Sequence, residues 1–239
     1  MDGKTLLDEL IVHCREARAA ASAPVVVFDL DHTLFDNGPR TWQILLEFAE
    51  ARGHKALRAA LDGLSHTGLP YLLSETLARC GIEDDALHAE AFAFWRERFF
   101  TDEYQRFDLP LAGAVDFVRQ LYDEGATVVY LSGRDAPGML VGCAASLRHH
   151  GFPVGLARTS IVLKHDFETL DLDFKREAVS YISTLGVVIA TFDNEPGNCN
   201  LFQEAWPKAR NVYVTTAHAP NPPKLIDGIA AIADFAAAK

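Results

Sequence analysis

The chain has 239 residues, of which 49% are hydrophobic and 23% are charged. These proportions are those of an ordinary globular protein, and they exclude a disordered or collagen-like chain. The formal net charge of −11 argues against non-specific binding to nucleic acids and to anionic membranes, because an acidic surface repels polyphosphates. A small phosphorylated substrate stays compatible with this charge, since a bound metal ion reverses the local sign.

The cysteines and the apolar segments indicate the compartment. The four cysteines are far apart and form no CxxC motif, which favours reduced thiols over a zinc site. The N-terminal residues lack the pattern of a signal peptide, and no apolar run approaches the 18 residues that a membrane span needs. We therefore expect a cytoplasmic protein without a membrane partner. Its oligomeric state is left open.

The first half of the chain combines one strand with several helices. Residues 5–21 have the apolar spacing of an amphipathic helix, and residues 25–28 form a short apolar run typical of a buried strand. Between about 40 and 107 only helical patterns occur, with apolar stripes over 69–80 and 84–100. This stretch predicts an all-helical segment.

After Pro110 the patterns of helices and strands alternate. In chain order we expect a helix over 112–124, a strand over 127–131, a helix ending at Gly151, a strand near 160–163, a helix over 175–186, a strand over 187–192, another helix, a strand over 211–215, and an alanine-rich C-terminal helix. Such alternation predicts a parallel sheet with helices on both faces.

These elements predict a doubly wound α/β core with an insert. Residues 1–36 and 110–239 form the core, and residues 37–109 form an all-helical cap inserted after the first strand. In open parallel sheets, ligands bind at the carboxyl ends of the strands. The insert would therefore cover the binding site as a lid.

Two aspartates follow the first strand, in the sequence Asp29-Leu30-Asp31-His32-Thr33. Residues two apart leave a strand on the same side, and two such carboxylates need a shared proton or a cation. This arrangement suits a carboxylate nucleophile beside a carboxylic acid. For an isolated pair, two solvated turn aspartates are the alternative interpretation.

The second strand of the alternating region ends in Leu131-Ser132-Gly133-Arg134-Asp135. Ser132 can donate a hydrogen bond to a phosphate oxygen, and Gly133 allows close approach of the backbone. Arg134 could bind an anionic group of a substrate. The structural alternative is a serine that caps the next helix.

Later strands and helices add a lysine and a further aspartate. Lys175, at the expected start of a helix, is badly placed for the helix dipole, which suggests that it neutralises carboxylates and phosphate; Lys164 is the rival candidate. Asp193 ends its strand in the register of a Mg²⁺ ligand. Three neighbouring side chains could make water-mediated contacts to the metal: Asn194, Glu195 and Asn198.

These motifs, at consecutive strand ends, resemble those of the haloacid dehalogenase-like (HAD) phosphohydrolase superfamily. The resemblance rests on DLDHT, LSGRD, Lys175 and FDNE, and the insert is similar to the helical C1-type cap of that family. It implies a Rossmann-like core and a Mg²⁺-dependent phosphatase acting on a small phosphorylated metabolite.

The resemblance also implies roles for individual residues. Asp29 would be the nucleophile that forms an aspartyl-phosphate, and Asp31 the general acid and then the general base. Ser132 and Lys175 would hold the phosphoryl group. The implied metal ligands are Asp29, the backbone carbonyl of Asp31, and Asp193. The implied substrate-binding residues are Thr33, Gly133 and Arg134.

Departures from the family pattern leave alternatives open. The fourth motif often carries a second acid, where this chain has Asn194, Gly197 and Asn198. An acid at Asp31 favours phosphomonoesterases and phosphomutases over enzymes that cleave carbon–halogen bonds, because an alkoxide leaving group needs a proton. A phosphomutase, a phosphatase of nucleic-acid ends and a catalytically idle binding protein are the alternatives; the net charge disfavours long nucleic acids.

Overall fold

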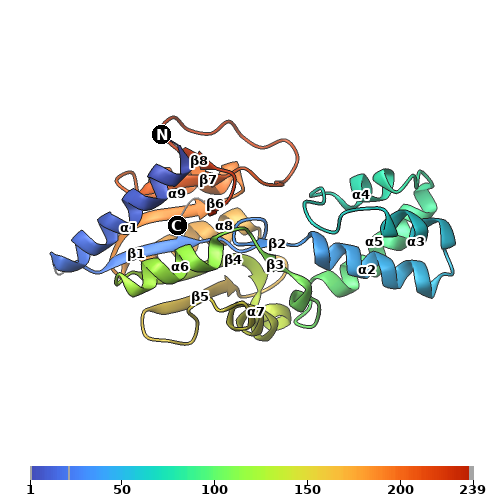
Figure 1. Cartoon of the computed structure of the whole chain (residues 1–239), viewed down its shortest axis with the longest axis horizontal. Coiled ribbons are helices and arrows are strands. Elements are labelled where there is room, and N and C mark those ends of the chain that lie inside the picture. Colours follow the sequence, from blue (N-terminus) through green and yellow to red (C-terminus); the bar gives the residue numbers. More distant parts are fainter. Residues whose placement is uncertain (1, 21, 237–239) are drawn as a thin grey trace.

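The computed structural model describes residues 2–20 and 22–236, which form a six-stranded sheet with an attached group of helices (Figure 1). Across the sheet the strands lie in the order β5 (Thr159–Lys164), β4 (Thr127–Asp135), β1 (Pro24–Phe28), β6 (Val187–Asp193), β7 (Arg210–Val214) and β8 (Ala230–Ile232). All neighbouring pairs are parallel. The predicted doubly wound α/β fold is confirmed.

Helices cover both faces of this sheet. On one face α1 (Gly3–Ala19), α6 (Ala114–Asp123) and α7 (Ala136–His150) pack against the strands, and on the other face α8 (Asp171–Ser183) and α9 (Pro196–Ala205) do so. Strand β1 is buried at every residue, as expected for a central strand covered on both sides. Within the described ranges, no helix is both long and apolar enough to cross a membrane.

Between β1 and β4 the chain leaves the sheet and forms a separate group of helices, here called the cap (Figure 1). The cap contains α2 (Gly38–Ala51), α3 (Lys55–Asp62), α4 (Leu73–Arg79), α5 (Asp85–Phe99) and the 3-10 helix η1 (Tyr104–Phe107). Helices α2 to α5 share an apolar core of their own.

The cap joins the core through a short antiparallel ribbon. Its strands β2 (Phe35–Asp36) and β3 (Leu109–Pro110) pair Phe35 with Pro110 and Asp36 with Leu109. The sequence does not predict this ribbon, because two residues per strand are too few for an alternating pattern to show.

The start of α8 differs from the prediction. The helix begins at Asp171, four residues before Lys175, so that Asp171 and Asp173 occupy the first turn. Acidic residues fit the helix dipole there. The argument that Lys175 opposes the dipole from the first turn is therefore wrong. The expected stripe over 69–80 is also shorter in the structure, where α4 starts at Leu73.

The predicted alanine-rich C-terminal helix is wrong for residues up to 236, and residues 237–239 lie outside the described part. Residues Ala230–Ile232 form β8, which pairs with β7, and Ile232 and Phe235 are buried in the core. Alanine favours helices, but a short isolated helix is only marginally stable in water. Pairing at the sheet edge and burial of two large side chains outweigh that preference.

Candidate active site

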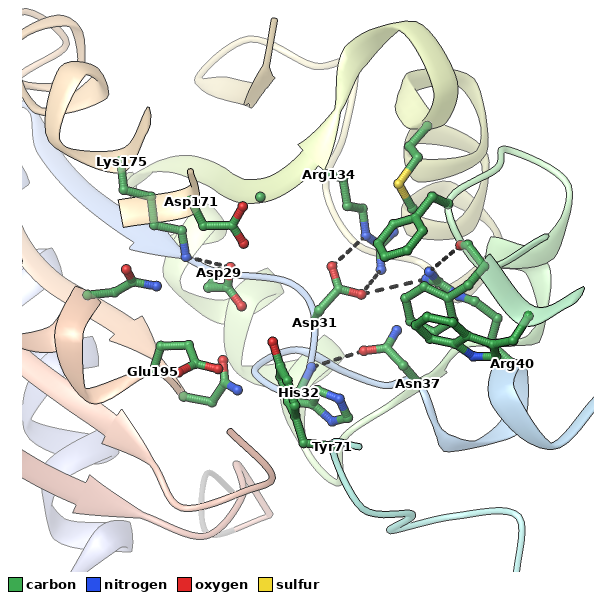
Figure 2. Close-up of a pocket in the computed structure, with 17 residues that line it drawn as sticks. Asp29, Asp31, His32, Asn37, Arg40, Tyr71, Arg134, Asp171, Lys175 and Glu195 are labelled. Atoms are coloured by element: carbon green, nitrogen blue, oxygen red, sulfur yellow. Dashed lines mark hydrogen bonds and ion pairs between the residues drawn. The ribbon is translucent and has the colours of Figure 1, made fainter. Parts of the chain in front are cut away.

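A cavity of about 200 Å³ lies where the sheet meets the cap (Figure 2). Its floor is at the carboxyl ends of the central strands, because Asp29 follows β1 directly and Gly133 and Arg134 lie near the end of β4. Lys175 reaches in from α8. The cap supplies aromatic side chains on the other side.

Lys175 connects the first and the last of the predicted motifs. Its Nζ lies 2.7 Å from Oδ1 of Asp29 and 2.6 Å from Oδ2 of Asp193, and all three side chains are buried. Burial alone would lower the pKa of Lys175, but the two carboxylates outweigh it and raise the pKa above its ordinary value. The lysine is therefore held as a cation between two acids.

Lys164, the rival lysine, serves another purpose. Its Nζ lies 2.9 Å from Oδ1 of Asp171 and donates to the backbone carbonyls of Phe167 and Thr169. These contacts close the loop between β5 and α8. Of the two candidates, Lys175 is the one that faces Asp29.

The pair of carboxylates around Lys175 carries more negative charge than one lysine balances. Burial raises the pKa of Asp29 to about 7, with Lys175 opposing and with Asp193 and Asp31 acting in the same direction as burial. Carboxylates in such surroundings gain stability from a further cation.

The donor set fits Mg²⁺. No group of three or more His, Cys, Asp or Glu side chains suited to a metal occurs among the described residues. Mg²⁺ is commonly held by one or two carboxylates and keeps several waters, however, so Asp29, Asp193 and the backbone carbonyl of Asp31 are enough.

Asp193 is oriented by residues that follow it. Its Oδ1 accepts hydrogen bonds from the backbone N–H of Glu195 at 2.9 Å and from Nδ2 of Asn198 at 3.1 Å. Thr33 is fully buried and donates to Oδ1 of Asn194 at 3.1 Å. Thr33 does not line the cavity, so its predicted contact with substrate is not supported. It holds the first and fourth motifs together instead.

Asp31 is clamped by arginines. Arg134 binds it through two hydrogen bonds, Nε to Oδ2 at 2.8 Å and Nη2 to Oδ1 at 3.0 Å, and Arg40 approaches Oδ1 to 3.7 Å (Figure 2). Burial alone would raise the pKa of Asp31, but Arg134 and then Arg40 outweigh it and hold the pKa well below its ordinary value. Arg134 thus positions Asp31 and favours its ionised form.

A buried ion-pair network extends from this clamp to the cap. Asp108 is fully buried and accepts from Nε of Arg40 at 2.8 Å and from Nη2 of Arg134 at 2.9 Å. Nη1 of Arg134 donates to Oε1 of Gln105. Arg134 is thereby committed to protein groups, and its predicted contact with a substrate anion is not supported.

Arg40, Asp108 and Gln105 were not found from the sequence. They lie in the cap and its return segment, and they belong to none of the motifs. Arg40 and Asp108 are 68 residues apart, so that no local spacing signals their contact.

Of the predicted site residues in the second motif, Gly133 and Arg134 line the cavity and Ser132 does not. Ser132 is fully buried; its Oγ accepts from the backbone N–H of Arg134 at 3.3 Å and donates to Oδ2 of Asp31 at 3.4 Å. Gly133 does line the cavity. A Cβ there would lie 2.2 Å from Oδ2 of Asp171, so any other residue at this position would displace that carboxylate.

Comparison with known proteins connects this arrangement to one fold. No family model and no curated protein matches the sequence. A candidate phosphatase from Clostridium difficile is 16% identical, with a TM-score of 0.54 over 83% of this chain and 87% of that chain. Protein Tyrosine Kinase A of Mycobacterium tuberculosis is 17% identical, with a TM-score of 0.55 over 89% and 94%. A candidate haloacid dehalogenase-like hydrolase from Burkholderia xenovorans is 14% identical, with a TM-score of 0.52 over 90% and 94%.

These matches establish that the chain has the fold of haloacid dehalogenase-like proteins. The resemblance drawn from the motifs is confirmed at this level. Because the identities are low and the similar proteins carry different names, the chemistry of this chain has to be argued from its own cavity.

Proposed function

We propose that this protein is a Mg²⁺-dependent phosphatase that hydrolyses a small phosphomonoester through an aspartyl-phosphate on Asp29. The observation that carries the proposal is the contact of Lys175 with both Asp29 and Asp193 in a cavity that Asp31 also lines. Asp29 and Asp31 follow β1, Lys175 comes from α8 and Asp193 ends β6, so three separate chain segments bring the nucleophile, the cation and the further acids to one place. The fold is one that hosts hydrolases of this kind.

In the first step an Oδ atom of Asp29 attacks phosphorus. The new bond joins Asp29 to phosphorus, and the bond from phosphorus to the alcohol oxygen breaks. Asp31 enters this step protonated and supplies the proton that the leaving oxygen takes up. The proton that Asp31 accepts from water in the second step restores this form for the next cycle. Lys175 stays beside Asp29 and offsets negative charge that spreads over the transferring group.

In the second step water attacks phosphorus of the aspartyl-phosphate. The carboxylate of Asp31 accepts a proton from that water, inorganic phosphate leaves, and Asp29 is regenerated. The clamp by Arg134 favours the ionised form of Asp31, which is the form that a base requires.

Asp29, Asp193 and the backbone carbonyl of Asp31 would hold Mg²⁺, and the ion would supply positive charge against the phosphoryl oxygens. The chain provides one cation, Lys175, for two buried carboxylates, so this additional charge matches a need of the site.

Metal dependence is the direct test of the proposed function. With p-nitrophenyl phosphate we expect p-nitrophenol release in the presence of Mg²⁺, its loss on addition of EDTA, and its return when excess Mg²⁺ is added back. Release that is unaffected by EDTA would contradict the role of the metal. No release with p-nitrophenyl phosphate or with acetyl phosphate, in either condition, would contradict the phosphatase.

The two lysines give a matched pair of variants. Lys175→Met is expected to lower kcat about 10²–10³-fold, the effect of removing one charge-stabilising donor from an active site. Lys164→Met removes a lysine of equal length that does not contact Asp29, and we expect a change below about threefold on the same scale. Steady-state kinetics on both variants, with circular dichroism to check folding, tests whether Lys175 is the lysine that binds the phosphoryl group. Equal losses of kcat in the two variants would contradict this assignment.

A further inference from the structure

The wall of the cavity that faces Asp31 is aromatic. Cap residues Trp95, Phe99 and Phe100 line it, and their rings pack on one another, with centroids 4.4 Å apart for Trp95 and Phe99 and 5.1 Å apart for Phe99 and Phe100. Met139 of α7 adds a further apolar side chain. A leaving group that extends from Asp31 toward the cap therefore meets these apolar side chains, beside the arginines that hold Asp31.

The polar atoms within this wall are already used by the protein. Nε1 of Trp95 donates to Oγ1 of Thr41 at 3.1 Å. Arg40 donates to Asp108 and, at 3.0 Å, to the backbone carbonyl of Phe99. The hydroxyl groups of a sugar placed against this wall would lose water without gaining partners, which costs free energy for each group.

One donor is left over near the phosphoryl end. Asn37 is 2% exposed, lines the cavity, and within the described residues its Nδ2 has no hydrogen-bond partner. Its orientation is fixed, because Oδ1 accepts from the backbone N–H of His32 at 3.2 Å (Figure 2). Nδ2 is shielded from solvent and lacks a partner, so an ester oxygen that comes within its reach when the substrate displaces its neighbours would supply the missing acceptor.

A second hollow begins where the aromatic wall ends. This groove, of about 440 Å³, lies between α4 and α5 and shares Tyr71 and Trp95 with the first cavity. Its walls are Leu72, Leu73, Leu77, Ala89 and Phe92, together with Ser74 and His88. Nε2 of His88 is engaged with the carbonyl of Ile82.

The groove is apolar and yet open to solvent. Tyr71, Leu72 and Phe92 are 45%, 37% and 50% exposed, and they form one patch beside the cavity. Contiguous exposed apolar surface of this kind is typical of binding sites. Tyr71 and Trp95 line both the cavity and the groove, so a long molecule held at Asp29 has these two side chains as its path toward the groove.

We propose that the substrate is a phosphomonoester of an elongated apolar alcohol, whose phosphate binds at Asp29 and Lys175 and whose hydrocarbon part passes Tyr71 and Trp95 into the groove. Asn37 donates to an ester oxygen. Beyond that oxygen, the site selects substrates by the length and the apolar character of the alcohol. This inference rests on the proposed phosphatase activity and narrows it to a substrate class, excluding sugar phosphates.

A series of alkyl phosphates tests the inference. From ethyl to hexyl phosphate, kept below micellar concentrations, kcat/KM should rise roughly fourfold for each methylene buried. The kcat/KM for 3-phenylpropyl phosphate should exceed that for glycerol 1-phosphate by more than ~10-fold. Glycerol 1-phosphate is a primary ester with the same three-carbon chain, which carries hydroxyl groups and no phenyl ring. A flat series, or glycerol 1-phosphate as the better substrate, would overturn the inference while leaving the phosphatase intact.

Variants at Phe92 and at Asn37 test the groove and the phosphoryl end of the site independently. Phe92→Ala should lower the ratio of kcat/KM for hexyl over ethyl phosphate about tenfold, whereas Tyr181→Ala, an equally exposed aromatic residue on α8, should not change that ratio. Asn37→Ala should lower kcat/KM for every ester by one common factor, with the slope of the series preserved. A Phe92→Ala variant that alters the oligomeric state and not the ratio would assign the groove to a second copy of the chain.

Binding measured in a variant without turnover distinguishes the inference about the substrate from the proposed phosphatase activity. Calorimetric titration of Asp29→Asn with ethyl, butyl and hexyl phosphate should give the same increase in affinity per methylene. If the wild-type protein hydrolyses no phosphate ester, the proposed function fails. A flat affinity series in Asp29→Asn would overturn the inference independently of any activity.

Discussion

Replacing Asp29 with asparagine is expected to reduce phosphatase activity on the order of 10⁴–10⁶-fold, the scale on which removal of a nucleophile acts in other hydrolases. Asparagine keeps the size of the side chain and still accepts a hydrogen bond from Lys175, but its amide cannot form the phosphorylated intermediate. The measurement is release of inorganic phosphate under saturating Mg²⁺.

The control for Asp29→Asn is a measurement of its thermal stability. Lys175 keeps Asp193 as its partner, at 2.6 Å, so the melting temperature should stay within roughly 5 °C of the wild type. Asp29→Ala guards against slow deamidation of asparagine back to aspartate. Phosphate release near the wild-type rate from both variants would rule out Asp29 as the nucleophile.

Asp108→Asn should have the largest effect on stability. Asp108 is fully buried and is the carboxylate that Arg40 and Arg134 share, so the substitution leaves two buried guanidinium groups with one charge partner fewer. Breaking a buried ion pair in this way costs about 3–5 kcal/mol. At this chain length such a loss lowers the melting temperature by about 6–20 °C.

Urea denaturation of Asp108→Asn beside Asp227→Asn checks this expectation. Asp227 is exposed, and loss of its charge should change the free energy of unfolding by less than about 0.5 kcal/mol. Similar midpoints for both variants would show that the network contributes specificity of structure rather than stability.

The core of the fold could be predicted from the sequence because its signals are local. The apolar run at Val25–Phe28 is a strand that is buried on both faces, and a turn or cap follows each strand of the alternating region. The C-terminal residues could not be predicted in this way. Their alanines favour a helix, and the pairing of Ala230–Ile232 with the edge of β7, the preceding strand, outweighs that preference.

The motifs located the carboxylates but not their environment. Asp29, Asp31 and Asp193 are placed by strand ends, which a pattern can reveal, whereas Lys175 lies within α8. The partners of Asp31 depend on how the cap folds back, and Arg40 and Asp108 meet only through that packing. Lys175 contacts Asp29 and Asp193, but the argument from the helix dipole was wrong, since α8 begins at Asp171.

The Asp29–Lys175–Asp193 contact also makes activity a late marker of folding. Asp29 and Lys175 are 146 residues apart in sequence and come from β1 and α8, while Asp193 ends β6. Contacts of such high sequence separation carry a large loop-closure cost and form slowly. In a refolding experiment, helical circular dichroism should therefore recover before phosphate turnover, and no fragment that ends before β6 can assemble this cluster.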